Sequence, residues 1–133
     1  MSIAFRVAVE SDHPFIYNSW LRSFRNSSFS RAIPNEQYYS KQGALITYLL
    51  ASGVTLLAVD PEDTNIIWGY VNTSGHKINY IYCKYLFRKM GIARQLVGAF
   101  NIQEPYTVTH MTNFTSGRMN IVFDPSLLAR FYA

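Results

Sequence analysis

The arrangement of apolar residues changes at Gly53, and this change limits the possible folds more than any other feature of the chain. Before Gly53, the apolar residues Ile16, Trp20 and Phe24 recur every four positions, which is typical of an amphipathic helix. After it, helical spacing gives way to apolar runs joined by short turns, at residues 54–60, 66–74 and 78–85. These runs predict an antiparallel meander of three strands.

The neighbouring segments extend this pattern on both sides. We predict a first strand at 4–9 and, after the first helix, a loop at 25–34 and a second helix over 35–52. Helical spacing returns over 92–100, and a further strand is expected at 106–112. Because roughly 20 residues between the last two strands suffice for a crossover through a helix, we expect those strands to be parallel. The predicted fold class is therefore α+β, with a mostly antiparallel mixed sheet and one parallel crossover.

Length and composition predict a single folded domain spanning residues 1–133. Apolar residues make up 49% of the chain and charged residues only 15%, which excludes an intrinsically disordered protein. The secondary structure of the tail after residue 112 has two alternatives. Residues 116–123 fit either a helix or an edge strand, and Asp124 with Pro125 fits the start of a short last helix.

Cysteine content and hydropathy predict a location in the reducing cytoplasm. Cys83 is the single cysteine, so it has no partner for an internal disulfide and too few companions for a structural zinc site, and we expect no metal. The N-terminus lacks a basic stretch followed by an apolar segment, and no apolar run approaches the length that crosses a bilayer. We therefore expect a soluble protein that has no membrane partner.

The basic residues are concentrated in one part of the chain. The net charge is +4, but between Asp63 and Glu104 there are five Lys or Arg residues and no acidic residue. A local excess of positive charge favours an anionic ligand.

The most informative segment is the loop between the strand 78–85 and the next helix. It holds Arg88, Lys89, Met90, Gly91, Ile92 and Ala93. The first turn of a helix presents unpaired N–H groups at the positive end of the helix dipole, and glycine permits a positive φ and a close backbone approach. With the added charge of Arg88 and Lys89, this loop predicts a phosphate site. The alternative is a basic surface turn closed by a glycine.

These six residues resemble the pyrophosphate-binding motif of the GCN5-related N-acetyltransferases (GNAT family), R/Q-x-x-G-x-G/A. Phe87 before the motif and Leu96 and Val97 after it extend the resemblance, and Ala93 stands where a second glycine is commoner. The order of elements from residue 4 to about residue 112 is also similar to the order in that fold. The compact chain looks like small acetyltransferase-like proteins of bacteriophages, which would place it in the host cytoplasm.

The resemblance implies an N-acyltransferase that moves an acetyl group from acetyl-CoA, its co-substrate, to an amine by direct attack. The cofactor would lie where the strands 78–85 and 106–112 separate. Backbone groups of Tyr82, Cys83 and Lys84 would pair with the pantetheine arm, and N–H groups of residues 89–93 would hold the pyrophosphate. Asn113 lies where such proteins often place an asparagine that contacts pantetheine, although an asparagine after a strand is also an ordinary turn former.

Two residues are predicted as catalytic, His110 and Tyr132. Imidazole titrates near neutral pH, so His110 suits a general base, although a lone histidine in a strand also suits a structural role. The family often uses a tyrosine after the fifth strand as general acid to the leaving thiolate. Residues 113–123 contain no tyrosine, so Tyr132 takes this role only if the tail folds toward the site.

Two other functions stay open at this point. The chain can keep the fold as a catalytically inactive binding module for nucleic acid or a protein partner, which the basic window and the missing tyrosine favour. A phosphate-rich ligand other than coenzyme A also fits the loop, because helix N-termini do not choose among anions. The amine acceptor has no recognisable motif.

Overall fold

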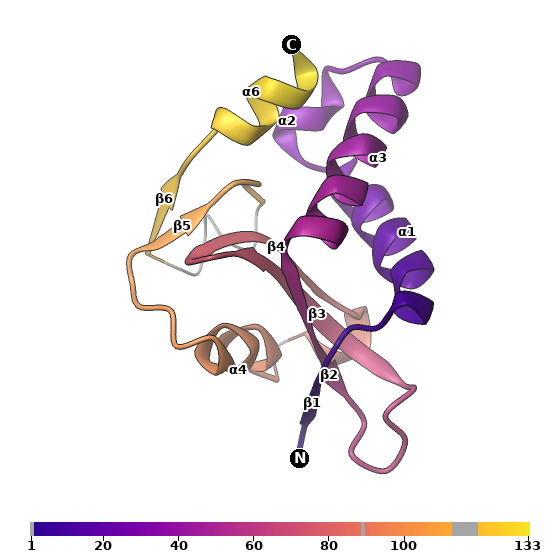
Figure 1. Ribbon diagram of the computed structural model, residues 1–133, viewed down its shortest axis with the longest axis vertical. Helices are drawn as coiled ribbons and strands as arrows, with labels where there is room; N and C mark the ends of the chain where they lie inside the picture. Colours follow the sequence, from indigo (N-terminus) through magenta and orange to yellow (C-terminus); the bar gives the residue numbers. More distant parts are fainter. Residues whose placement is uncertain (1, 89, 113–119) are drawn as a thin grey trace.

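A computed structural model describes residues 2–88, 90–112 and 120–133 of the chain (Figure 1). Its elements, in chain order, are β1 (Ala4–Val7), α1 (His13–Phe24), α2 (Ser28–Arg31), α3 (Asn35–Ser52), β2 (Val54–Val59), β3 (Ile67–Ser74), β4 (Lys77–Cys83), α4 (Ile92–Ala99), β5 (Tyr106–Val108), β6 (Ile121–Phe123) and α6 (Ser126–Tyr132). Two short 3-10 turns, η1 (Glu10–Asp12) and η2 (Tyr85–Phe87), precede α1 and follow β4.

The strands form one mixed sheet of six strands, in the order β1-β2-β3-β4-β5-β6. Neighbours from β1 to β4 are antiparallel, whereas β4 pairs with β5 and β5 with β6 in parallel. The predicted α+β class, the meander and the parallel crossover through a helix are confirmed. The sequence did not decide the structure of the tail. In the structure, residues 121–123 pair in parallel with β5, and residues 126–132 form the last helix.

The helices cover the sheet on both faces, with α1 and α3 on one face and α4 on the other (Figure 1). Trp20 of α1 stacks on Tyr80 of β4 with ring centroids 4.9 Å apart and an interplanar angle of 2°. On the opposite face, Ile92, Leu96 and Val97 of α4 are buried against the sheet. The helical spacing in the sequence therefore identified the buried faces of α1 and α4 correctly.

The loop expected at 25–34 contains the short helix α2, so that expectation was wrong in part. Serine hydroxyl groups supply the missing hydrogen bonds: Ser27 Oγ accepts from the Ser30 backbone N–H at 3.2 Å, and Ser30 Oγ donates to Phe24 O at 2.9 Å. A Ser-rich segment can thus form one helical turn when its hydroxyl groups cap the turn.

The pairing of β3 with β4 slips by one residue at Asn79. Thr73 lies opposite Ile78 and Asn72 lies opposite Tyr80, which makes Asn79 the extra residue of a β-bulge. Its side chain is 1% exposed. The amide nitrogen donates to Asn72 Oδ1 and Ser74 Oγ, each at 2.8 Å, and the amide oxygen accepts from Thr109 Oγ1 at 2.8 Å. The bulge therefore ties β3, β4 and the end of β5 together.

Candidate functional site

The strands β4 and β5 are paired only over a short stretch. Their register joins Lys77 to Thr107 and Ile78 to Val108, and the Thr109 N–H then donates to Ile78 O at 3.1 Å. Past this point, no further backbone hydrogen bond joins the two strands in the part of the chain that the structure describes. On its other side, β4 stays paired with β3 as far as Cys83. We call residues 80–83, on the side of β4 that faces β5, the open edge.

The helix α4 follows the open edge in the chain: β4 ends at Cys83, and α4 begins at Ile92 after the turn η2. Gly91 precedes it with φ 75° and ψ 13°, in the left-handed region that glycine adopts without strain. No side chain of the described residues caps this N-terminus, and the first helical hydrogen bond runs from Gln95 N to Gly91 O at 3.1 Å. Among the described residues, a β-carbon placed on Gly91 would have only Gln95 Nε2 within 4 Å, at 3.9 Å. The N–H groups of the first turn are therefore approachable by an anion.

Two contacts fix the loop between β4 and α4. The ring of Phe87 stacks on Trp68 of β3 with centroids 4.8 Å apart, and Arg88 Nε donates to Cys83 O at 3.2 Å. The guanidinium of Arg88 also lies 5.5 Å from the ring centre of Tyr85. No carboxylate among the residues described pairs with Arg88. Arg88, three residues before Gly91, is thus tied to the end of β4 and keeps its charge free of the described carboxylates.

Of the predicted pantetheine residues, Tyr82 and Cys83 lie in the open edge, whereas Lys84 follows it and its N–H is bonded to β3. The ring of Tyr82 stacks on Tyr70 at 5.3 Å, and Lys84 N donates to Trp68 O at 2.9 Å. Burial raises the pKa of the Cys83 thiol to about 11, which keeps it protonated at neutral pH. Met90 is half-buried and packs against the same cluster as α4. Of these three residues, Cys83 is the one whose backbone oxygen binds Arg88.

Two predicted cofactor residues, Lys89 and Asn113, lie outside the described residues.

The two predicted catalytic residues are linked through Gln42 of α3. His110 is 1% exposed and its Nε2 lies 3.0 Å from Gln42 Nε2, while Tyr132 of α6 donates its hydroxyl proton to Gln42 Oε1 at 2.6 Å. Thr109 Oγ1 lies 3.0 Å from His110 Nδ1. Because Thr109 donates its one proton to Asn79, His110 Nδ1 must be the donor to Thr109 and Nε2 the acceptor from Gln42. His110 is therefore a neutral ring with both nitrogens engaged.

This environment suits a structural ring better than a general base. Burial lowers the pKa of His110 to about 3, and Phe24 and Trp20 surround the ring with centroids 4.8 Å and 5.4 Å away. Burial also raises the pKa of the Tyr132 hydroxyl, whose only proton is given to Gln42. Catalytic roles for His110 and Tyr132 stay predictions that would require these hydrogen bonds to open.

The buried His110 predicts a pH dependence of stability. Its pKa of about 3 in the folded state lies below the value near 6.5 of an unfolded histidine, so only the unfolded state takes up a proton between these limits. We expect this contribution to be constant above about pH 6.5 and to fall by roughly 1.4 kcal/mol per pH unit well below it. Urea unfolding of His110→Gln between pH 7 and 4 should give a flatter curve than the wild type. His76→Gln, in the exposed turn, serves as control, and parallel curves for His110→Gln and wild type would contradict the expectation.

Gly69 is a site residue that the sequence analysis missed. It lies opposite Cys83, and a β-carbon placed there would be 2.5 Å from Tyr82 O and 3.3 Å from Cys83 Cα. Only glycine allows β3 to approach the end of the open edge this closely. A lone glycine within an apolar strand run was the available signal.

Replacing Gly69 by alanine should therefore push β4 away from β3. We expect Gly69→Ala to lower the free energy of unfolding by about 1–3 kcal/mol, because the contacted atoms belong to the backbone and cannot turn aside. Chemical denaturation measures this change. Gly98→Ala is the matched control, since a β-carbon there meets nothing within 4 Å and alanine favours the helix. Equal unfolding midpoints for Gly69→Ala and wild type would show that the close approach is unimportant.

No group of three His, Cys, Asp or Glu side chains among the described residues is placed to hold a metal ion. None of the described helices is long and apolar enough to span a membrane.

No family model matches the chain, and no curated protein matches it. Solved structures do match. The apo form of YjaB from Escherichia coli is 20% identical over 75% of this chain and 65% of its own, with a TM-score of 0.56. A GCN5-related N-acetyltransferase from Rhodopseudomonas palustris is 16% identical over 76% of this chain and 64% of its own, with a TM-score of 0.54.

A third match was solved with AcCoA bound. This GNAT superfamily phosphinothricin acetyltransferase from Sinorhizobium meliloti is 19% identical over 75% of this chain and 58% of its own, with a TM-score of 0.52. The chain spans less than two thirds of the length of each of these three proteins. At these identities the likeness concerns architecture: the chain has the fold of the GCN5-related N-acetyltransferases.

Proposed function

We propose that the chain is a coenzyme A-dependent N-acyltransferase of the GNAT family, which moves an acetyl group from acetyl-CoA to an amine. One observation carries the proposal: the N-terminus of α4, uncapped by the described side chains, follows left-handed Gly91 and a loop that Arg88 ties to Cys83 at the end of the open edge. An anion site next to a strand edge that forms no backbone ladder with another described strand fits a ligand that has a diphosphate and an amide-containing arm.

The residues of the loop match the chemistry of such a ligand. The N–H groups of Gly91, Ile92 and Ala93 would donate to the diphosphate, and Arg88 would add a positive charge beside it. The buried side chains of Ile92 and Ala93 anchor this turn against the sheet, so the donors are held in place before the ligand arrives. Backbone groups of the open edge would pair with the two amides of the pantetheine arm, as an added strand pairs with a sheet edge.

The transfer itself asks little of the side chains. Acetyl-CoA supplies an activated acyl group, and the amine nitrogen forms a bond to its carbonyl carbon while the C–S bond breaks. One proton leaves the nitrogen and one proton ends on the coenzyme A sulfur. A backbone N–H at the open edge would stabilise the negative charge on the carbonyl oxygen. The protons of His110 and Tyr132 are donated to Thr109 and Gln42. Solvent water would therefore take the proton from the amine and give one to the sulfur.

Calorimetry tests the proposal directly. Titration of acetyl-CoA into the protein should give a saturable heat with one site, and incubation with acetyl-CoA and a panel of small amines should give acetylated products by mass spectrometry. No heat at high micromolar acetyl-CoA would overturn the proposal. Binding without any acetylated product would favour the inactive module.

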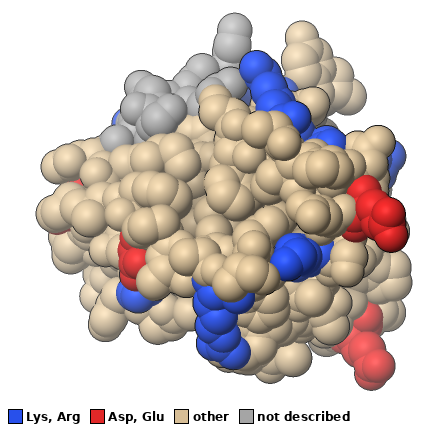
Figure 2. Space-filling view, turned by 90° about the horizontal axis from the view of Figure 1, so that it is seen from above, with Lys and Arg blue, Asp and Glu red and all other residues tan. Residues whose placement is uncertain are grey.

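The inactive module rests on a separate observation. Tyr85 and Leu86 are 79% and 82% exposed beside Arg88, which gives an apolar and basic surface of the kind that contacts nucleic acid or protein. On the face that Figure 2 shows, however, Lys and Arg side chains are separated by uncharged ones and form no continuous patch. Binding of single-stranded RNA measured across a salt series distinguishes the two functions, because binding through phosphates weakens steeply with salt.

A further inference from the structure

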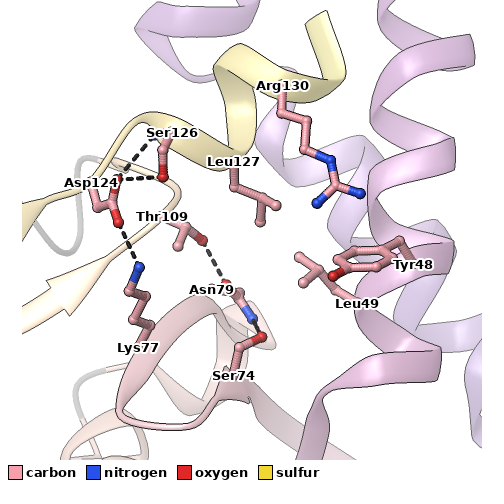
Figure 3. A pocket seen from close by; sticks show the side chains of 10 residues that line it. All are labelled: Tyr48, Leu49, Ser74, Lys77, Asn79, Thr109, Asp124, Ser126, Leu127 and Arg130. Atoms are coloured by element: carbon pink, nitrogen blue, oxygen red, sulfur yellow. Dashed lines mark hydrogen bonds and ion pairs between the residues drawn. The ribbon is translucent and has the colours of Figure 1, made fainter.

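A pocket separate from the Gly91 loop lies on the face of the sheet that α3 and α6 cover. It is a pocket of ≈ 290 Å³ whose walls come from α3, β4, the end of β5 and α6 (Figure 3). Tyr48, Leu49 and Leu127 give it an apolar side, and Asn79 and Thr109 lie at its polar side. Its volume is at the lower end of the range for small-molecule sites, which fits a ligand the size of an amino acid.

Arg130 carries a charge in this pocket that no acidic group among the described residues neutralises. Figure 3 shows its guanidinium extending from α6 toward Tyr48, and the group lies 5.3 Å from the centre of that ring. The other cation of the pocket, Lys77, is paired with Asp124 at 2.7 Å. Arg130 is exposed at this pocket, and a guanidinium over an aromatic ring keeps its N–H donors for the two oxygens of a carboxylate. The pocket therefore fits a ligand that has one carboxylate and an apolar body.

The pocket also adjoins the place where the reaction would occur. Asn79 and Thr109 line the pocket, and the same two residues mark the point where β4 and β5 separate. Residues 79–83 of β4 span about 13 Å, which is four steps at the usual rise of a strand. A pantetheine arm, with its two amides and terminal thiol, has the length of roughly four to five extended residues. An arm laid along β4 from Cys83, where Arg88 ties the loop to the strand, would thus bring its thioester to Asn79 and Thr109.

We infer that this pocket is the acceptor site and that it selects small amines that carry a carboxylate, such as amino acids. The inference rests on the proposed function. Arg130 binds the carboxylate, and Tyr48 and Leu127 contact the apolar body, which leaves the amine directed toward Asn79. The amine nitrogen then bonds to the thioester carbonyl carbon, the C–S bond breaks, and the coenzyme A sulfur ends with a proton in exchange for the one lost from nitrogen.

Pairs of amines that differ only in the carboxylate test the inference. The probes are L-leucine with 3-methylbutylamine, and L-phenylalanine with 2-phenylethylamine, each incubated with the full chain and acetyl-CoA and assayed by mass spectrometry. We expect kcat/KM to be at least 10-fold higher for each amino acid than for its amine. Arg130→Gln should bring this ratio close to one, chiefly by raising KM for the amino acids. Arg22→Gln, an exposed arginine of α1, should keep the wild-type ratio.

The outcomes separate the two levels of the argument when acetyl-CoA binding is measured in parallel. If acetyl-CoA binds but the wild type does not prefer the amino acids, or acetylates none of the four probes, the acceptor assignment is overturned and the cofactor site stands. A preference that Arg130→Gln leaves intact also overturns it. If acetyl-CoA does not bind at all, the proposed function fails and the acceptor role fails with it.

Discussion

Gly91→Glu is expected to abolish acetyl-CoA binding, with a loss of affinity of at least 100-fold. Two effects act together. The φ of 75° at this position costs a non-glycine residue roughly 1–2 kcal/mol, so the turn before α4 is strained or rearranged. The new carboxylate also lies at the N-terminus where the diphosphate would bind, and like charges repel. Calorimetric titration of acetyl-CoA measures the loss.

Two other variants control for unfolding and for charge. Gly98→Glu introduces the same side chain into the same helix, where a β-carbon meets nothing within 4 Å, and should leave the affinity within about twofold. Gly91→Asn, which tolerates the left-handed region without adding charge, should lie between the two. If Gly91→Glu bound acetyl-CoA as well as Gly98→Glu does, the diphosphate could not lie at this turn.

Asn79→Leu is expected to be the most destabilising single substitution in the sheet, with a loss of about 3 kcal/mol in the free energy of unfolding. Removal of this amide leaves Asn72 Oδ1 without its donor and the Thr109 hydroxyl without its acceptor. Each buried polar group left unsatisfied costs roughly 1–3 kcal/mol. Urea denaturation monitored by tryptophan fluorescence gives the value.

Asn18→Leu provides the comparison, because Asn18 is exposed on α1 and the same change should alter the unfolding free energy by less than about 0.5 kcal/mol. Asn79→Leu should also weaken acetyl-CoA binding at temperatures where the variant is folded, because the bulge defines where β4 and β5 separate. A stability equal to that of Asn18→Leu would show that the bulge is not held by this hydrogen-bond network.

The periodicity of the sequence predicted most of the fold because it reports on local structure and on which face is buried. The stripe of Ile16, Trp20 and Phe24 is completely buried, and the three β-rich runs pair in the expected order. The strand expected at 106–112 ends at Val108 instead. Beyond Val108, Thr109 forms a hydrogen bond with Asn79 and His110 forms one with Gln42. Local sequence cannot predict these contacts, because the partners are distant in the chain.

The candidate site was also predictable only where it depends on local sequence. The Gly91 turn could be predicted because a glycine just before a helix indicates a left-handed turn without any knowledge of distant residues. The environment of His110 was not, because its two hydrogen-bond partners and its aromatic neighbours come from α1, α3 and the adjacent Thr109. The position of Arg130 could not be predicted for the same reason, because only the folded chain brings it to Tyr48 of α3.

Amide chemical shifts of the 15N-labelled chain during a titration with coenzyme A test the central claim most directly. The account predicts that the largest shifts occur at the amides of Gly91, Ile92 and Ala93, with a second group at Tyr82 and Cys83. Shifts that saturate elsewhere while these amides stay unchanged, or no shifts at millimolar coenzyme A, would contradict it.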